Sequence, residues 1–381
     1  MMSPSLTYLR LLSLFAALLL CIGPAISVPA PEDIRDDKRA VIRVKDGEFI
    51  QKAIDKAKKG TRIEVYGTHK EQVIINKDGI ELIGKGAKLY PPADLDRSSF
   101  CYGLSQTPQG QNTSAGICIH GSHLKLITPY DPFLGHYKVE SVGNPIKNVK
   151  VSGFEVTGFD GQNIVVYGGK NVKVHNNKLL AGGKYGFLTA GGKDTEASRN
   201  IVMGSSPTSL SGENGAIAMC MDDFADAKFL DNDVSDYFIG LCTETSGGLN
   251  KGNRVHGTCL GNVIDPNVVE AKSIENHIYN RHPQCPDGAA AGIFLFGSIR
   301  ALVKDSRIEG IGPNVNGSGV VVLDFPGVVA TGNRVRENVF GENDVDIYVD
   351  SAGKNDIRDN KCDVSFRNTT TGPVPAPEFC K

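Results

Sequence analysis

The sequence lacks tryptophan, carries almost no net charge and has a single long apolar run, at residues 11–22. The absence of tryptophan excludes every family signature that contains this residue. A net charge of −2 provides neither the basic surface that binds nucleic acid nor a polybasic segment that holds a membrane. Outside the N-terminal run, no stretch of sequence approaches the length that spans a bilayer. We therefore expect neither nucleic acid nor a membrane as a partner.

The N-terminus predicts export. Arg10 precedes the apolar run, and small residues follow at 25–27, as in a cleavable signal peptide. We assign residues 1–27 to this signal and expect a secreted, extracellular protein. Residues 28–39 are polar and end in Lys38-Arg39, which is either a propeptide-processing site or an ordinary solvated charge pair.

The cysteines agree with export. Eight remain after the signal, and an even number in an exported chain favours disulfides. Their spacings match no zinc ribbon or finger. The simplest connectivity joins sequence neighbours: Cys101–Cys118, Cys220–Cys242, Cys259–Cys285 and Cys362–Cys380. Short acceptor motifs predict N-glycosylation at Asn112, Asn316 and Asn368.

A short pattern repeats along most of the chain: a small polar residue, any residue, then Val, Ile or Leu. Its copies begin at Phe154, Asn177, Asn200, Asn232, Asn253, Asn276, Ser306, Asn333 and Asn360. The steps between them range from 21 to 32 residues, which is typical of a solenoid with occasional insertions. A second β-rich segment lies between successive copies, for example at residues 163–167 and 319–323. Asparagine tolerates the left-handed bend between strands, and stacked amides can hydrogen-bond along the axis.

The first coil opens with a predicted amphipathic helix within residues 47–58, followed by strands at 62–66, 72–76 and 80–83. This helix, together with Glu81-Leu-Ile-Gly-Lys-Gly86, resembles the N-terminal opening of the right-handed parallel β-helix repeat proteins of the pectin-lyase-like superfamily. The resemblance implies an all-β solenoid with a capping helix over residues 40–365. Residues 91–145 break the repeat and are interpreted as an inserted loop region, and residues 366–381 are interpreted as a Pro- and Thr-rich C-terminal tail. It implies no single activity, because this architecture hosts lyases, hydrolases, epimerases, adhesins and tailspikes.

Acidic residues fall together when two coils are aligned without gaps. Asp222 then lies beside Glu244 on neighbouring strands, about 4.8 Å apart, while Asp223 follows at once and Asp265 lies one coil further on. The same alternation places Ile217 and Ile239 inside the coil.

These carboxylates have two functional interpretations. Asp222, Glu244 and Asp265 can perform general acid–base chemistry on a glycosidic bond, and Asp222, Asp223 and Glu244 can bind a Ca²⁺ ion that neutralises a uronate. A solvated acidic turn is the alternative. The nearest basic candidates are Arg254, Arg281 and His282, which either donate a proton or hold a sugar carboxylate, or are exposed turn residues.

Apolar side chains continue along the outward positions of other coils. Tyr167, Phe294, Phe296 and Leu323 are candidates for substrate binding, by stacking on sugar rings or holding a hydrophobic small molecule. Alternatively, the inserted loop or the C-terminal tail covers them.

No catalytic set known in this superfamily carries over whole. Asp222-Asp223 matches the paired aspartates of polygalacturonase-like hydrolases, but the next coil reads Glu244-Thr-Ser-Gly-Gly and no Arg-Ile-Lys string exists. Tyr185-Gly-Phe187 matches half of a mannuronan-epimerase-like signature, but Leu-Thr-Ala-Gly follows in place of its catalytic half. Pectate-lyase-like signatures require the absent tryptophan.

The sequence therefore predicts a secreted β-helix that acts on an acidic or complex polysaccharide, as a lyase or epimerase. A non-catalytic protein that binds cell walls or a host is the alternative, and small-molecule chemistry on the apolar stripe is a weaker one. The oligomeric state does not follow from the sequence.

Overall fold

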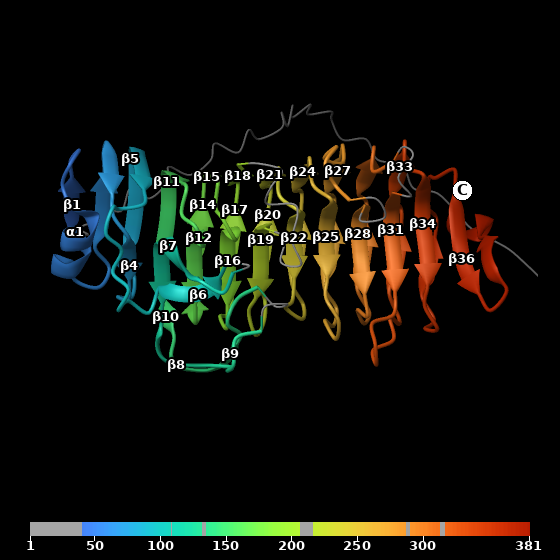
Figure 1. Cartoon of the computed structure of the whole chain (residues 1–381), viewed down its shortest axis with the longest axis horizontal. Coiled ribbons are helices and arrows are strands. Elements are labelled where there is room, and N and C mark those ends of the chain that lie inside the picture. The colour runs from blue at the N-terminus through green and yellow to red at the C-terminus, as the bar shows by residue number, and fades with distance from the viewer. Residues whose placement is uncertain (1–39, 108, 132–134, 206–215, 287–289, 313–316) are drawn as a thin grey trace, which may run out of the picture. The chain divides into compact units, whose positions relative to one another are not determined.

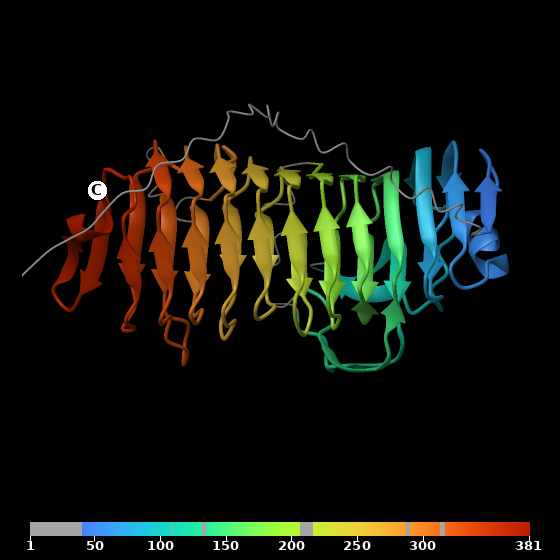
Figure 2. The same ribbon diagram turned by 180° about the vertical axis from the view of Figure 1, so that it is seen from behind.

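A computed structural model describes residues 40–107, 109–131, 135–205, 216–286, 290–312 and 317–381. The predicted signal peptide, the predicted propeptide and the sequon residue Asn316 lie outside the described residues. The described residues belong to one compact unit, a right-handed parallel β-helix whose coils stack along its long axis (Figure 1, Figure 2). Over the described ranges, no helix is long and apolar enough to cross a membrane.

One face of the stack is a sheet that has 13 strands within the described residues. Neighbours pair in parallel, except β6 against β7 and β36 against β37. Its strands are β4 (Val73–Ile75), β6 (Tyr102–Gln106), β7 (Asn112–His120), β12 (Gln162–Tyr167), β16 (Tyr185–Ala190), β19 (Ile217–Asp222), β22 (Ile239–Thr243), β25 (Leu260–Ile264), β28 (Ala291–Phe296), β31 (Ser318–Leu323), β34 (Val345–Asp350), β36 (Ser365–Thr369) and β37 (Gly372–Pro375).

The other faces form a sheet that has 20 strands in the same described ranges, joined where the long strands β5 and β11 bend. It consists of β1 (Val41–Val44), β2 (Arg62–Val65), β3 (Thr68–Lys70), β5 (Glu81–Tyr90), β11 (Lys150–Thr157), β14 (Lys173–His175), β15 (Lys178–Leu180), β17 (Glu196–Ser198), β18 (Ile201–Met203), β20 (Lys228–Leu230), β21 (Asp233–Ser235), β23 (Leu249–Lys251), β24 (Arg254–His256), β26 (Lys272–Ile274), β27 (His277–Tyr279), β29 (Leu302–Lys304), β30 (Arg307–Glu309), β32 (Arg334–Arg336), β33 (Val339–Gly341) and β35 (Asp356–Arg358).

The ends of the stack are closed by short elements. The predicted helix is confirmed as α1 (Ile50–Lys56), which buries Ile50, Ala53 and Ile54 over the first coil. At the other end, the 3-10 helix η3 (Pro377–Phe379) is held by Cys362–Cys380. All four neighbour disulfides are confirmed: Cys101–Cys118, Cys220–Cys242, Cys259–Cys285 and Cys362–Cys380.

The predicted insertion at 91–145 contains one regular strand of the solenoid. Residues of β7 pair with both β4 and β12, so the true excursions lie on either side of it. The second excursion carries the antiparallel pair β8 (Ser122–Leu126) and β9 (Val139–Asn144), and β10 (Ile146–Lys147) then returns to pair with β13 (Gly169–Lys170). The polar sequence around β7 hid its strand character.

The buried asparagine ladder is present, with one correction. Most of its amides donate to the next side chain along the axis, as in Asn232 Nδ2 to Asn253 Oδ1 at 3.0 Å, whereas Asn276 Nδ2 donates to Asn250 O and Ser273 Oγ. Asn333 was assigned to this series, and that is wrong: the backbone N–H of Ser306 donates to Asn338 Oδ1 at 3.0 Å, and Asn338 Nδ2 donates to Asn360 Oδ1 at 3.0 Å. Asn338 escapes the short pattern because Phe340 stands where Val, Ile or Leu is expected, yet Phe340, not Val335, occupies the core position beside Ile308.

Near the start of the strands in the 13-stranded sheet, side chains do not alternate regularly between the core and the outer face, because two successive residues face the core. A Cβ added to Gly240 would lie 2.4 Å from Val255 Cγ1, so this position faces the core, where no side chain fits. Ile217 and Ile239 are consequently turned to the outer face, where they pack against a second apolar cluster. The prediction that these two isoleucines lie inside is wrong.

Candidate functional site

Three acidic residues follow one another along the outer face of the 13-stranded sheet. Asp222 ends β19 in register with Ala190. The ladder continues past the ends of β22 and β25, because the N–H of Glu244 donates to Met221 O at 2.8 Å and the N–H of Asp265 donates to Thr243 O at 3.1 Å. Glu244 and Asp265 therefore occupy the next two positions of the same row. We call Asp222, Glu244 and Asp265 the acidic row.

The segment between β8 and β9 brings two basic side chains onto this row. His136 Nε2 lies 3.0 Å from Asp222 Oδ2, and its Nδ1 lies 3.0 Å from the Tyr185 hydroxyl. Lys138 Nζ lies 3.1 Å from Asp222 Oδ1 and also forms an ion pair with Glu244 Oε2. The result is a continuous network from Tyr185 through His136, Asp222 and Lys138 to Glu244.

This network is largely shielded from water. The side chains of His136, Asp222 and Glu244 are 0%, 14% and 9% exposed, respectively. Burial raises the pKa of Asp222, but hydrogen bonding and the charges of His136 and Lys138 outweigh it, so the net shift is downward. Asp222 is therefore held ionised and is poorly suited to take up a proton near neutral pH.

Asp265 has a different environment. Burial raises its pKa to about 6; the charge of Lys138 lowers it and that of Asp222 raises it further. Within the described part of the chain, no hydrogen bond or ion pair engages its carboxylate. A carboxylate with a pKa near neutrality and no fixed partner is the arrangement expected of a general base.

Asp223 does not join the acidic row. Its carboxylate is buried and accepts hydrogen bonds from the Thr189 hydroxyl and the Gly192 N–H, both at 2.8 Å. Burial raises its pKa to about 6, although these bonds and one from Thr195 lower it. The predicted triad of Asp222, Asp223 and Glu244 is thus divided between the outer face and the interior.

The side chains at this position do not fit a calcium site. Ligand atoms of His136, Asp222 and Glu244 lie within 4.8 Å of one another, yet the ammonium of Lys138 pairs with both carboxylates and supplies the positive charge. The second carboxylate oxygen of Glu244, Oε1, lies beside the sulfurs of Cys220 and Cys242, at 3.5 and 3.3 Å. Calcium prefers six to eight oxygen ligands, so we derive no step through it.

The predicted basic partners are not brought to the acidic row. Arg254 belongs to β24 in the other sheet, where it donates to the Tyr279 hydroxyl at 3.0 Å. Arg281 donates to the carbonyls of Cys285 and Pro286. The N–H of His282 donates to Thr258 O, just before β25, whereas Asp265 follows the far end of that strand.

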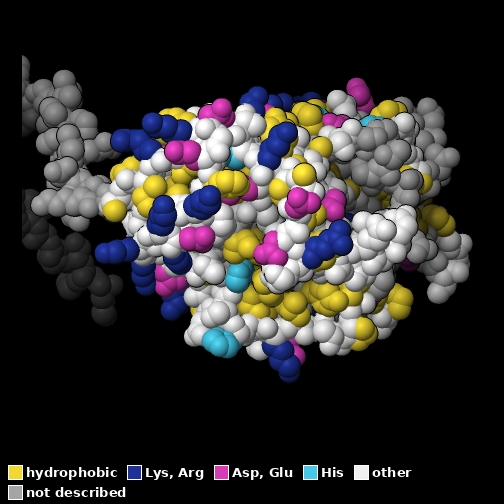
Figure 3. Space-filling model, turned by 60° about the vertical axis from the view of Figure 1, so that its left-hand side comes forward, with side chains coloured by type: hydrophobic (Ala, Val, Ile, Leu, Met, Phe, Trp, Pro, Cys, Tyr) yellow, Lys and Arg dark blue, Asp and Glu magenta, His cyan; other side chains and the backbone are white. Residues whose placement is uncertain are grey.

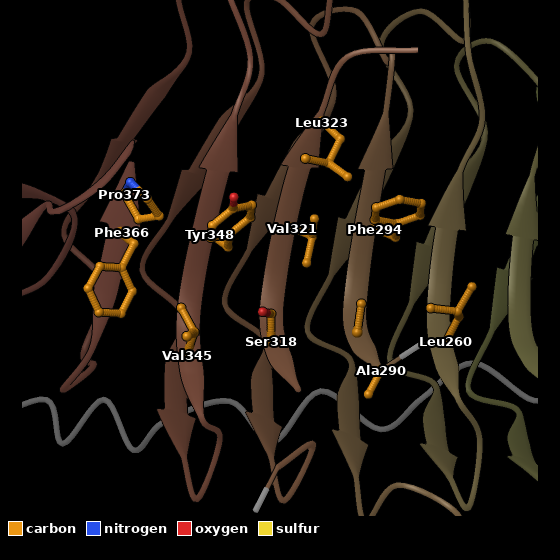
Figure 4. Close-up of a pocket in the computed structure, with 11 residues that line it drawn as sticks. Leu260, Ala290, Phe294, Ser318, Val321, Leu323, Val345, Tyr348, Phe366 and Pro373 are labelled. Atoms are coloured by element: carbon orange, nitrogen blue, oxygen red, sulfur yellow. The ribbon is translucent and has the colours of Figure 1, made fainter. Parts of the chain in front are cut away.

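The predicted aromatic residues divide into two groups. Tyr167 is fully buried, and its hydroxyl donates to Tyr137 O at 2.8 Å, so the insertion covers it. Phe294 and Leu323 line an open cavity of about 650 Å³ (Figure 4). Phe296 stacks on Phe294 with ring centroids 5.1 Å apart.

His136 and Lys138 could not be predicted as site residues, because the segment that carries them has no repeat from which a register could be read. Tyr185 stands out in the sequence only as the first residue of Tyr185-Gly-Phe187, which matches half of a mannuronan-epimerase-like signature. Over the N-terminal part of the surface, charges of both signs are interspersed (Figure 3), in keeping with the small net charge. The electrostatic character of the site is therefore local.

Comparison with known proteins defines the fold. No protein-family profile matches the chain, and no curated protein sequence matches it. Among solved structures, the Dettilon tailspike protein superposes with a TM-score of 0.50 and 16% identity, covering 81% of this chain and 61% of the tailspike. The chain thus spans about three fifths of the tailspike's length.

In two further similar structures, the matched region covers nearly the full length of the other protein's chain. DFA-IIIase from Arthrobacter chlorophenolicus A6 has a TM-score of 0.49 and 13% identity over 85% of this chain and 95% of its own. Alginate lyase from Paenibacillus sp. str. FPU-7 has a TM-score of 0.46 and 12% identity over 84% and 94%. Identities at this level show the fold alone, which is a parallel β-helix.

Proposed function

We propose that this chain is a secreted β-helix protein that acts on an acidic polysaccharide at the acidic row, by lyase or epimerase chemistry. The observation that carries the proposal is Asp265, whose carboxylate has no hydrogen-bond or ion-pair partner among the described residues and lies next to two carboxylates, Asp222 and Glu244, that share the ammonium of Lys138. The choice of polysaccharide rests on analogy with other proteins of this fold. The four disulfides support secretion.

Lyase and epimerase reactions share their first step, removal of the proton from the carbon next to a uronate carboxylate. Asp265 is the base in this proposal, because a pKa of about 6 leaves it ionised but still basic at neutral pH. In an elimination, the electron pair forms the C=C bond and the glycosidic C–O bond breaks, with a proton passing to the leaving oxygen. In an epimerisation, a proton returns to the opposite face of the same carbon.

Lys138 and His136 have supporting roles in this scheme. An ammonium carries three N–H groups, and Lys138 directs two of them at Asp222 and Glu244, so the third can hold the substrate carboxylate. His136, fixed between Tyr185 and Asp222, orients that network. Asp222 and Glu244 are thus positioning residues.

The test is an assay on a panel of uronic-acid polysaccharides, following the absorbance of unsaturated products and the exchange of substrate hydrogen with deuterated water. Asp265→Asn removes the base with little change in size and should abolish both signals. Asp350→Asn is the matched control, because Asp350 belongs to the same row further along the stack but is exposed. Equal activity in the two variants contradicts the assignment.

Calcium provides a separate arm of the same assay. Because Lys138 already supplies the positive charge beside the row, chelation with EDTA should leave the rate unchanged. A rate restored by added calcium after chelation would refute the role given to Lys138.

A non-catalytic binding role is the second candidate, and one observation favours it. His136, Lys138, Asp222 and Glu244 satisfy one another, as they would if their only task were to hold the insertion on the sheet. If the protein shows no activity on any substrate but still binds polysaccharide in a pull-down, this alternative is supported.

A further inference from the structure

An open cavity of about 650 Å³ lies on the outer face of the 13-stranded sheet, beyond the acidic row. Its walls come from successive strands between β25 and β36, so its long direction follows the solenoid axis (Figure 4). A volume of this size falls within the range of small-molecule sites, which is about 300–1,000 Å³.

The cavity is the uncovered half of a continuous apolar stripe. Over β7 to β22 the same outer rows carry Val165, Leu188 and the Cys220–Cys242 disulfide, and the insertion buries them in one apolar cluster. From β28 onward the stripe continues as Phe294, Val321, Tyr348 and Phe366. These side chains are accessible from the cavity in the described structure.

The chemistry of the lining selects the occupant. Among the described residues that line the cavity none is charged, and two, Ser318 and Tyr348, carry a hydroxyl. A sugar would bring a hydroxyl on almost every ring carbon, and most of these would be buried without a partner, which is costly. An uncharged lining instead matches an uncharged apolar ligand.

Aromatic rings give the ligand a shape. Phe294 on β28, Tyr348 on β34 and Phe366 on β36 line the cavity. Phe296, which does not line it, stacks on Phe294 at 5.1 Å and meets Phe325 edge-on at 5.0 Å, so it supports the Phe294 ring. Planar or fused rings pack well on such walls, because offset stacking and edge contacts add to the hydrophobic gain.

A second copy of the chain fits the cavity poorly. Stable protein interfaces bury about 800 Å² on each partner and use side chains that project from the surface. The large apolar side chains of the described residues that are most exposed are Val41, Phe49, Tyr66, Ile127, Ile201, Met203, Phe224, Val329, Val339 and Val374. None of these lines the cavity, whose apolar groups are recessed.

We propose that this cavity binds an uncharged, apolar small molecule that contains aromatic or fused rings. The site is separate from the acidic row, and its ligand is a different class from the polysaccharide of the proposed function. Polar contact is confined to the Ser318 and Tyr348 hydroxyls, so a single hydroxyl or carbonyl group on the ligand suffices.

The test is a titration of the purified protein with N-phenyl-1-naphthylamine, an apolar dye whose fluorescence rises when it leaves water. We expect saturable binding of one dye per chain. Val321→Glu places a charge on the cavity floor and should weaken binding at least tenfold. Ala291→Phe fills the cavity without a charge and should also weaken it. Val339→Glu is the matched control, because Val339 is exposed on the 20-stranded sheet.

Thermal melting by circular dichroism establishes that each variant is folded, and Ala291→Phe keeps the test valid if Val321→Glu fails to fold. Dye binding that is unsaturable, or equally strong in both cavity variants and the control, overturns the proposal. Displacement of the dye by oligouronides would make the cavity a carbohydrate subsite. Light scattering that shows a dimer broken by Val321→Glu would make it a self-association surface. Either result overturns the proposal whether or not the acidic row proves active.

Discussion

Replacing the buried Asp223 by asparagine should change how the stability of the protein depends on pH. Its pKa is raised from 3.8 to about 6 in the folded chain. Below pH 3.8 the group is protonated in both the folded and the unfolded chain. As the pH rises from there to about 6, the unfolded chain loses this proton first, so stability falls, and above pH 6 the loss is complete. The shift of about two pKa units corresponds to about 3 kcal/mol.

The assay is urea unfolding of the wild type and Asp223→Asn at several pH values between 3.5 and 8, a range of about four units chosen to span both pKa values. The asparagine does not titrate, so the variant's free energy of unfolding should gain about 3 kcal/mol on the wild type across this range. Any constant cost of the new amide cancels, because only the change with pH is used. Its oxygen can still accept from Thr189 and Gly192.

Asp222 provides an internal control of opposite sign. Its pKa is lowered by His136 and Lys138 against the effect of burial, so its contribution to stability is present above pH 3.8 and is lost as the pH falls further. Asp222→Asn should therefore destabilise at neutral pH and differ less from the wild type in acid. If the difference in free energy of unfolding between Asp223→Asn and the wild type does not vary with pH, the pKa assigned to Asp223 is wrong.

Three other outcomes follow. If Asp265 is the base, activity on a uronate polymer should fall as the pH drops through about 6; a profile flat from pH 5 to 8, a range of about one to two units on either side of that pKa, would contradict its role. Asn253→Ala removes donors to Phe229 O and Asn276 Oδ1 and should lower the free energy of unfolding by about 2–4 kcal/mol in urea, whereas a loss below about 0.5 kcal/mol would mean that water replaces the amide. Gly240→Ala forces a methyl group against Val255 and should cost about 1–3 kcal/mol. Gly341→Ala is the matched control, because it lies in a strand without a positive φ and its added Cβ would meet only Glu309 Cβ at 3.9 Å.

Periodicity explains which features could be predicted from the sequence. A repeat fixes which residues lie side by side in successive coils, so the solenoid and the stacking of Asp222 beside Glu244 followed from it, whereas the disulfides were predicted as the simplest pairing of sequence neighbours. Asn333 shows its limit: Asn333-Arg-Val335 fits the pattern and Asn338-Val-Phe340 does not, yet the packing of Phe340 makes Asn338 the member of the ladder. Ile217 shows another, because the narrow core at Gly240 interrupts the simple alternation.

The partners of the acidic row could not be predicted in this way. His136 and Lys138 come from a segment without a repeat, and its path over the sheet is set by tertiary contacts such as His136 with Tyr185. Arg254 carries the positive charge that the acidic row needs and lies close to Glu244 in sequence. However, successive strands of one coil belong to different faces of the solenoid, and Arg254 lies in β24 of the 20-stranded sheet.

The insertion that carries Lys138 also has a consequence for how such a protein can change over generations. The strands beneath it and those beyond it present nearly the same apolar stripe to the outside. What distinguishes a sealed surface from an accessible one is therefore the length and position of one connecting segment. Lengthening the connection before β28 or β31 could close the cavity, and shortening the excursion before β10 could open a second one, without altering a single coil.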